Sequence, residues 1–343
     1  MPRRTPLLAA LAAAVALSGC VSSAEGSSPP PPASGPGPAA VTEAVVAAAA
    51  AFLAGLTPEQ RERVRYDSDD PALREWSYFP GRSDRNGIAI GELTDEQRAA
   101  AFAVAEETLS DSGYAQLRGV LAAEDALGVR NGEPEVDSDR YFIAFFGEPS
   151  TTGRFTVQIT GHHLAVNTTF EGDRISPTPA FTGVDPVDFE ADGRRLRPML
   201  AETEAFTALV ESLGEDALAA ARIGAIDDVR VGTGRSDRYP EPEGTLVSDL
   251  TEEQRGRVTA FVRAWVGDTD ERVAEPLVQQ YEAEFDRTRI AVSGSLDPDT
   301  PGAYLRIDGP RLWIEFSNVG RFGNGDNHYH SIYRDKRADY LGR

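Results

Sequence analysis

The sequence is poor in cysteine and histidine. Its 343 residues include one cysteine and four histidines. Because a single cysteine cannot form a disulfide within the chain, the folded part must rest on its hydrophobic core alone. The histidines form two tight pairs, His162 and His163 in "GHHLAVN" and His328 and His330 in "NHYH". Since nothing else in the sequence identifies a reaction, the question of function depends largely on these pairs.

Familiar catalytic motifs are missing as well. The sequence contains no G-x-S-x-G nucleophile elbow, no phosphate-binding P-loop and no H-E-x-x-H helix. Basic residues are also too few for a nucleic-acid-binding face, since the formal net charge is -21 at pH 7 and such a face must neutralise phosphates. We therefore expect no nucleic-acid partner.

The N-terminus has the layout of a secretory signal peptide. Arg3 and Arg4 precede an apolar run that is too short to span a membrane and that ends in "LSGC" at Cys20. This tetrapeptide resembles a bacterial lipobox, in which the signal is removed just before a cysteine that becomes lipidated. We therefore expect a signal peptide over residues 1–19, a lipid on Cys20, and an exported protein anchored by that lipid to the outer face of the cell membrane.

Residues 20–40 are predicted to form a disordered tether. After the cysteine the chain is rich in serine, glycine, proline and alanine, and such a segment cannot bury enough apolar surface to offset its ordering entropy. The remainder is long enough for a large core, and no second tract of this composition divides it. We therefore predict a single folded domain over residues 41–343.

One hexamer occurs three times along the chain, as "LTPEQR" from Leu56, "LTDEQR" from Leu93 and "LTEEQR" from Leu250. In each copy the threonine stands three residues before a glutamine. This is the spacing of a capping box, in which both side chains satisfy free N–H groups of the first helical turn. Each hexamer therefore predicts the start of a helix.

Longer stretches repeat too. "IAFFG" from Ile143 is followed by "FTVQITGHHLAVNTTF", and "IAVSG" from Ile290 is followed by "AYLRIDGPRLWIEFSN". Both pairs of stretches are typical of strand, turn at glycine, strand, with one apolar face along each strand. The second copy has proline and arginine where the first has His162 and His163, so the repeated fold does not itself require that histidine pair.

These repeats predict an α+β fold that is internally duplicated. Each half is a capped helical part followed by an antiparallel β part, and the halves, about 41–190 and 191–343, form one compact domain. Apolar residues at a spacing of three to four predict the principal helices. These helices are expected over residues 41–56, 97–109, 199–213 and 254–266.

Strand periodicity makes different predictions for the two histidine pairs. Because side chains alternate across a strand, His162 and His163 should point to opposite faces. His328 and His330 should share a face if residues 327–333 are extended, with Cα atoms about 6.6 Å apart. That is the arrangement by which a His-x-His strand holds a metal ion.

Several long motifs resemble one protein family. They are "WSYFP" at Trp76, "RNGIAIGELTDEQR", "LSDSGY" at Leu109, "FFGEP" at Phe145, "GHHLAVN", "TPAFTGVDP" at Thr178 and "NHYHSIYRDKRADYLG". In these motifs, over nearly the whole exported part, the chain resembles the bacterial and fungal "domain of unknown function 3500" family. The resemblance implies no particular activity. Relatives usually run somewhat further past the last motif, so we expect any ligand from such a tail to be missing here.

The histidines predict a metal site. His163 or His162, together with His328 and His330, would supply three imidazoles and leave a coordination position for water or substrate. Zinc, copper and iron all accept imidazole. Such a site would suit a metal-dependent enzyme, hydrolytic or redox. Polar residues near the pairs are candidates for orienting an imidazole or binding a ligand: Asn167, Glu315, Asp326, Arg334 and Asp335.

Two other functions fit the same sequence. His328, His330 and Arg334 could donate hydrogen bonds to the carboxylate or phosphate of a small anionic molecule. Alternatively, the protein could be a lipid-tethered scaffold without chemistry that binds a peptide or another protein through Trp76, Tyr78 and Phe79, although such aromatics more often belong to a core. The metal, the substrate and the oligomeric state are left open by the sequence.

Overall fold

The computed structural model describes residues 37–81, 84–133, 136–233, 238–320 and 326–342. The predicted signal peptide, Cys20 and nearly all of the predicted tether lie outside these ranges. The first helix begins at Pro38, slightly before the predicted start of the folded part at residue 41.

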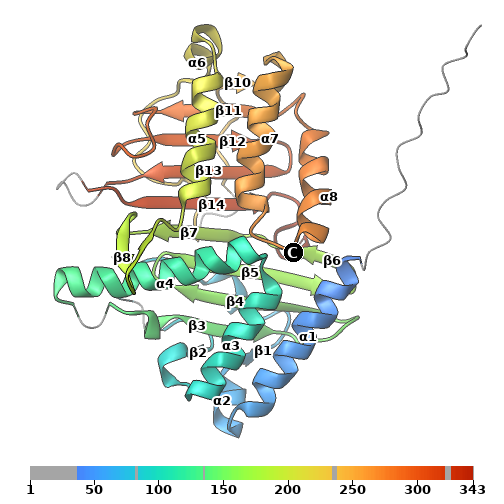
Figure 1. The fold of residues 1–343 in the computed structure, drawn as a ribbon. Coiled ribbons are helices and arrows are strands. Elements are labelled where there is room, and N and C mark those ends of the chain that lie inside the picture. The colour runs from blue at the N-terminus through green and yellow to red at the C-terminus, as the bar shows by residue number, and fades with distance from the viewer. Residues whose placement is uncertain (1–36, 82–83, 134–135, 234–237, 321–325, 343) are drawn as a thin grey trace, which may run out of the picture. The chain divides into compact units, whose positions relative to one another are not determined.

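Eight α-helices and one large sheet make the described part of the chain an α+β domain (Figure 1). The four predicted helices are confirmed as α1, α3, α5 and α7, with slightly shifted ends. The helices are α1 (Pro38–Gly55), α2 (Pro58–Arg63), α3 (Asp95–Thr108), α4 (Asp111–Asn131), α5 (Leu200–Ser212), α6 (Glu215–Ala221), α7 (Glu252–Val266) and α8 (Glu271–Glu282).

The three repeated hexamers do begin helices. Helices α2, α3 and α7 each start with a complete capping box, at Thr57–Gln60, Thr94–Gln97 and Thr251–Gln254. In each box the threonine hydroxyl accepts the glutamine N–H, and the glutamine side chain accepts the threonine N–H, at 2.9 to 3.3 Å. Two long helices that the apolar pattern did not indicate are α4, which contains three glycines, and α8, which contains Pro276.

One twelve-stranded sheet runs through the domain in the order β1-β3-β4-β5-β7-β14-β13-β12-β11-β10, with β2 beside β3 and β6 beside β5. Strand β1 pairs parallel with β3, and the other strand pairs of this sheet are antiparallel. Its strands are β1 (Arg65–Tyr66), β2 (Ile88–Ala89), β3 (Phe142–Phe146), β4 (Arg154–Gly161), β5 (Leu164–Glu171), β6 (Arg174–Ser176), β7 (Ala180–Val184), β10 (Thr245–Leu246), β11 (Arg289–Ser293), β12 (Tyr304–Asp308), β13 (Leu312–Asn318) and β14 (Tyr329–Asp335). A separate hairpin is formed by β8 (Phe189–Ala191) and β9 (Arg194–Leu196).

The centre of the sheet joins segments far apart in sequence. Strand β14, near the C-terminus, pairs antiparallel with β7, and His330 stands opposite Gly183 in this ladder. The strands from β1 to β7 therefore lie on one side of this seam, and those from β14 to β10 lie on the other (Figure 1).

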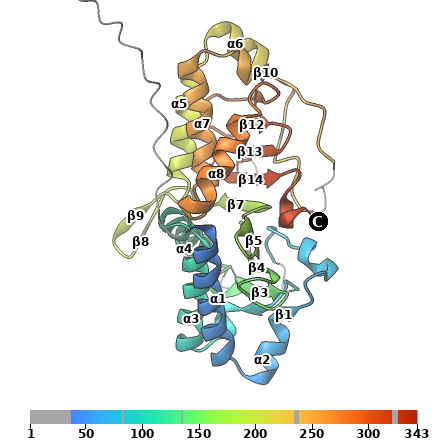
Figure 2. The same cartoon turned by 90° about the vertical axis from the view of Figure 1, so that its right-hand side faces the viewer.

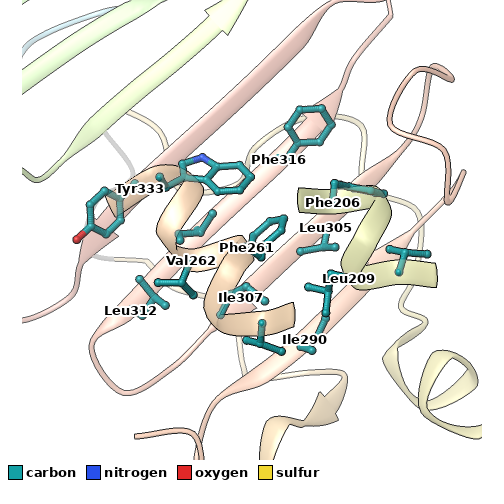
Figure 3. Packing of buried hydrophobic residues seen from close by; sticks show 14 of the residues in the cluster. Phe206, Leu209, Phe261, Val262, Ile290, Leu305, Ile307, Leu312, Phe316 and Tyr333 are labelled. Atoms are coloured by element: carbon teal, nitrogen blue, oxygen red, sulfur yellow. The ribbon is translucent and has the colours of Figure 1, made fainter. Parts of the chain in front are cut away.

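The long helices cover one face of the sheet (Figure 2). The apolar strand face predicted from alternation packs beneath them in two clusters, with Phe155, Val157 and Ile159 in one and Leu312, Ile314 and Phe316 in the other. Figure 3 shows how Phe206 of α5 and Phe261 of α7 pack on the second cluster.

In the described part of the chain, the opposite face of the sheet is covered by irregular segments and short 3₁₀ helices. Trp76, Tyr78, Val229 and Val231 from these segments are buried together with residues of the central strands, among them Phe181, Trp313 and Ile332. Trp76 and Tyr78 are only 4% and 6% exposed and belong to the core, whereas Phe79 is 53% exposed.

Helix α1 is the one described helix that is long and apolar enough to cross a membrane by length and composition, with a mean hydropathy of 1.6. Its apolar residues have a local reason, because Val45, Ala49 and Phe52 are fully buried in the helix-covered core. Helix α1 also contacts α3 along its length, as a core helix does.

Candidate metal centre

His162 and His163 form the two-residue turn between β4 and β5, because Gly161 and Leu164 are the last paired residues of that hairpin. The prediction that the two rings point to opposite faces is wrong. Their rings stack, with centroids 3.7 Å apart. The alternation rule fails here because His163 has left the strand conformation, with φ at +63°.

The backbone of His163 is fixed on both sides. Its N–H donates to the carbonyl of Tyr78 at 3.1 Å, and its carbonyl accepts the N–H of Gly183 at 2.7 Å. A left-handed backbone is unfavourable for a residue with a side chain, so these bonds hold the turn in a conformation that aims the ring inward. The His163 side chain is accordingly buried.

The second pair lies at the start of β14. His328 immediately precedes the strand, and His330 is its second residue. The N–H of His328 donates to the side-chain oxygen of Asn318 at 3.2 Å, and its carbonyl accepts the N–H of Val319 at 2.9 Å. The end of β13 therefore fixes the position of His328.

Pairing of β7 with β14 brings the two histidine pairs together. Nε2 of His163 lies 2.7 Å from Nε2 of His328. The ring of His330 lies 5.5 Å from that of His163 and 4.6 Å from that of His328, between centroids. One nitrogen from each of these three residues lies within 4.8 Å of the others. We call His162, His163, His328 and His330 the histidine cluster.

The spacing of the nitrogens is close to that of metal ligands. At zinc–nitrogen bonds of 2.0 to 2.1 Å, two imidazole nitrogens at tetrahedral positions lie about 3.3 Å apart. The His163 and His328 nitrogens are nearer than this, at hydrogen-bonding distance. Sharing an ion would therefore require these two rings to separate by only about half an ångström.

Two carboxylates orient the outer rings of the cluster. Asp228 Oδ1 lies 2.8 Å from Nδ1 of His330, and the Glu124 carboxylate oxygens lie 2.8 and 2.9 Å from Nδ1 of His162. A carboxylate on one imidazole nitrogen fixes the tautomer that leaves the other nitrogen free to bind a metal. Neither acid was predicted, because Glu124 lies in the unpredicted helix α4 and Asp228 in an irregular segment.

Gly183 lies next to the rings of both His163 and His330. A Cβ atom at this position would lie 3.0 Å from Cδ2 of His163, 3.1 Å from Cδ2 of His330 and 2.9 Å from the carbonyl of Tyr329. These distances are shorter than ordinary contacts, so a side chain here would push the imidazoles apart. The glycine thus permits the close approach of the two pairs.

Burial lowers the pKa of His163 well below its usual range, and the neighbouring His162, His328 and His330 lower this pKa further. His163 is therefore neutral at neutral pH. A neutral imidazole is the form that binds a metal. His162, His163 and Glu124 form a second group whose possible ligand atoms lie within 4.8 Å of one another, so the carboxylate of Glu124 is also near enough to serve as a metal ligand.

Most of the polar residues proposed to assist the histidines are engaged elsewhere. Asn167 donates to the carbonyl of Pro179 and accepts from Gln158. Arg334 donates to Asp339, whereas Asp335 accepts from Arg311. Asp326 is exposed and lies two residues before His328. The anion site that would combine Arg334 with the histidines therefore has no support from this geometry.

Glu315 supports the histidine cluster indirectly, through a neighbouring backbone segment. Its carboxylate accepts the N–H groups of Arg230 and Val231 at 2.8 and 3.0 Å, as well as hydrogen bonds from Tyr304 and Trp313. It thereby fixes the irregular segment that carries Asp228. Glu315 is thus a support for the carboxylate that orients His330, not a direct partner of an imidazole.

Comparison with known proteins gives a family but no activity. No curated protein and no solved structure matches the chain. A family model described as "Protein of unknown function (DUF3500)" matches residues 38–342, a range that includes the whole histidine cluster and both carboxylates that orient it. The chain therefore belongs to the DUF3500 family.

Proposed function

We propose that this protein binds one divalent transition-metal ion through His163, His328 and His330. The observation that carries the proposal is the convergence of three imidazole nitrogens from two segments far apart in sequence. Three imidazoles would leave one position of a four-coordinate ion for water or substrate. Such a centre supports hydrolytic chemistry with zinc, or redox chemistry with copper or iron.

The surroundings of the cluster support a metal rather than ordinary packing. The turn that holds His162 and His163 has a counterpart between β12 and β13, where Pro310 and Arg311 stand instead. The hairpin therefore does not need histidines. A carboxylate behind His330 and a neutral His163 are features that metal-binding imidazoles share.

The metal proposal is tested by titrating the full folded chain, purified without a His-tag and freed of metal by a chelator, with Zn²⁺, Cu²⁺ and Co²⁺ in a calorimeter. We expect saturable binding of one equivalent for at least one of these ions. Binding that does not saturate, or that saturates at several equivalents of equal affinity, would contradict a single built site and would favour a scaffold function.

Asp228→Asn is expected to weaken metal binding by about 10- to 100-fold, because an amide is a poorer acceptor for the Nδ1–H of His330 than a carboxylate. The matched control is Asp227→Asn, which neutralises the exposed neighbour and should leave the affinity unchanged. Equal effects of the two variants would show that the change reflects only the loss of negative charge.

We also infer that the domain arose by internal duplication. The elements β2, α3, α4, β3, β4, β5 and β7 follow the same order as β10, α7, α8, β11, β12, β13 and β14. The two sets of strands also have the same neighbours, counted outward from the β7–β14 seam. A pseudo-two-fold axis between β7 and β14 would account for this arrangement and for the meeting of the two histidine pairs.

Matched side-chain contacts support the duplication. Gln97 donates to the carbonyl of Gly55 at 2.9 Å, and Gln254 donates to that of Ser212 at 2.8 Å. Each glutamine belongs to a capping box and each carbonyl lies at the end of the helix that packs beside it. A duplicated origin accounts for such long-range contacts more simply than convergence does.

For location, we propose an exported lipoprotein held at the membrane through Cys20. Cys20→Ala is expected to release the protein from the membrane fraction without changing its melting temperature, because the cysteine lies well before the first helix. Fractionation before and after a high-salt wash measures this. Retention of the variant in the washed membranes would show that the lipobox interpretation is wrong.

A further inference from the structure

A second candidate site lies away from the histidine cluster, between helices α4 and α5 and the end of α7. It is a surface pocket of about 400 Å³, within the range of pockets that hold small molecules. Leu196, Pro198 and Leu200 provide an apolar wall, and Gln116, Glu202 and Asp268 provide polar groups. We call this the α4–α5 pocket.

Glu202 is an unusual residue in this pocket. It is 2% exposed. One carboxylate oxygen accepts a hydrogen bond from the side chain of Gln116, while the other, Oε2, is buried and has no partner among the described residues. A buried carboxylate oxygen without a partner is costly. The pocket wall therefore carries an acceptor that the protein itself does not satisfy.

Asp268 places a second carboxyl group in the same pocket. Burial raises the pKa of Glu202 to about 7. Burial and the nearby Glu202 carboxylate also raise the pKa of Asp268. The Glu202 carboxylate thus disfavours the charged form of Asp268, and a positive group placed beside the two acids would favour the charged forms of both.

The proposed duplication does not require an acid at the position of Glu202. The carbonyls of Gly55 and Ser212 are matched contacts in the two halves. Val45 precedes Gly55 in α1 by as many residues as Glu202 precedes Ser212 in α5, so Val45 corresponds to Glu202. Val45 is a fully buried core residue. A helix that could carry valine at this position carries a carboxylate instead, which points to a use for the charge.

Positive side chains at the rim of the pocket are already paired. Arg263 makes two hydrogen bonds to Glu275, and Arg197 lies within ion-pair distance of Asp188 and Asp299. These two arginines are therefore engaged with carboxylates other than Glu202 and Asp268. The net charge of the chain, -21, also favours the approach of a cation over an anion.

We propose that the α4–α5 pocket binds a small organic ammonium ion. Its charged group would lie beside the carboxyl groups of Glu202 and Asp268, where a small shift of the Glu202 side chain would let it donate to Oε2, and its apolar part would lie against Leu196, Pro198 and Leu200. Calcium fits less well, because it takes six to eight oxygen ligands and the pocket offers only two carboxyl groups. This site is independent of the proposed metal centre.

The test uses the full chain at pH 8 and two probes, n-butylammonium and benzylammonium, with n-butanol, sodium butyrate and Ca²⁺ as comparisons. Binding is measured by ligand-observed NMR. Molecules of this size are expected to bind with a Kd of about 1 to 10 mM. We expect at least one of the two ammonium ions to bind in this range and the three comparison solutes to bind at least tenfold more weakly.

Glu202→Gln is expected to weaken ammonium binding at least tenfold, while Glu211→Gln, which neutralises an exposed acid on the same helix, should have no effect. Glu202→Gln should melt no lower than the parent at pH 8, since it removes a buried carboxylate. If it does not fold, Asp268→Asn takes its place. Unchanged binding in the variant, binding of neither ammonium ion, or tighter binding of butanol, butyrate or Ca²⁺ would overturn the proposal.

Discussion

His163→Asn is expected to abolish stoichiometric metal binding while the fold is retained. His163 is the residue that joins the two histidine pairs, since its Nε2 lies beside that of His328 and its ring faces that of His330. Asparagine is chosen because it tolerates the left-handed backbone of this turn, so the β4–β5 hairpin should form as before.

The affinity lost in this variant should be at least about 100-fold, since removing even a group that only orients a ligand costs 10- to 100-fold. Calorimetric titration with the ion that binds the parent chain measures the change. His162→Ala is the control. His162 stacks on His163 but is not one of the three converging residues, so its loss should cost about tenfold or less. A His163→Asn variant that binds as tightly as the parent would exclude this residue as a ligand.

Gly87→Ala and Gly244→Ala are expected to destabilise the protein strongly and to a similar extent. Gly87 and Gly244 have φ angles of +93° and +98°. A Cβ atom on Gly87 would lie 1.9 Å from the carbonyl oxygen of Ile143, and one on Gly244 would lie 2.0 Å from that of Ile290. Gly87→Ala therefore forces β2 away from β3, and Gly244→Ala forces β10 away from β11.

The expected loss is at least about 3 kcal/mol for each variant, because backbone strain adds to the displacement of a buried strand. The melting temperature measured by circular dichroism should fall by about 5 to 10 °C. Gly256→Ala is the control, since Gly256 lies within helix α7 with open space around it and should gain about 0.5 to 1 kcal/mol. A large loss in one half and none in the other would argue against equivalent roles for the two glycines.

Local signals made much of the fold predictable. The capping boxes at Thr94 and Thr251 use only residues within one helical turn, so a short pattern suffices to place α3 and α7. Strand alternation likewise predicted the apolar faces that carry Phe155 and Phe316, and these faces lie in the helix-covered core. Helix α4 was not predicted because its glycines weaken the helical pattern. In the folded protein, packing between helices and sheet overrides that weakness.

The histidine cluster was predictable in its members but not in its geometry. The rarity of histidine drew attention to all four residues, and the spacing of His328 and His330 indicated a shared face. The stacking of His162 on His163 depends on a left-handed turn held by Tyr78 and Gly183, which no local pattern specifies.

The carboxylates that orient the imidazoles could not be found in the same way. Glu124 and Asp228 reach His162 and His330 only through tertiary packing, and each is far in sequence from its partner. Among the residues proposed from sequence proximity, Glu315 contributes by holding the backbone near Asp228. Proximity along the chain is therefore a poor guide to which acid supports which histidine in this fold.

The central claim is tested most directly by anomalous X-ray diffraction from crystals of the untagged protein, with data collected on both sides of the absorption edge of the ion that binds in solution. We predict one strong anomalous peak about 2.0 to 2.1 Å from a ring nitrogen of each of His163, His328 and His330, with Asp228 still on Nδ1 of His330. A peak elsewhere, or a direct hydrogen bond between His163 and His328 in crystals saturated with that ion, would contradict the proposed metal centre.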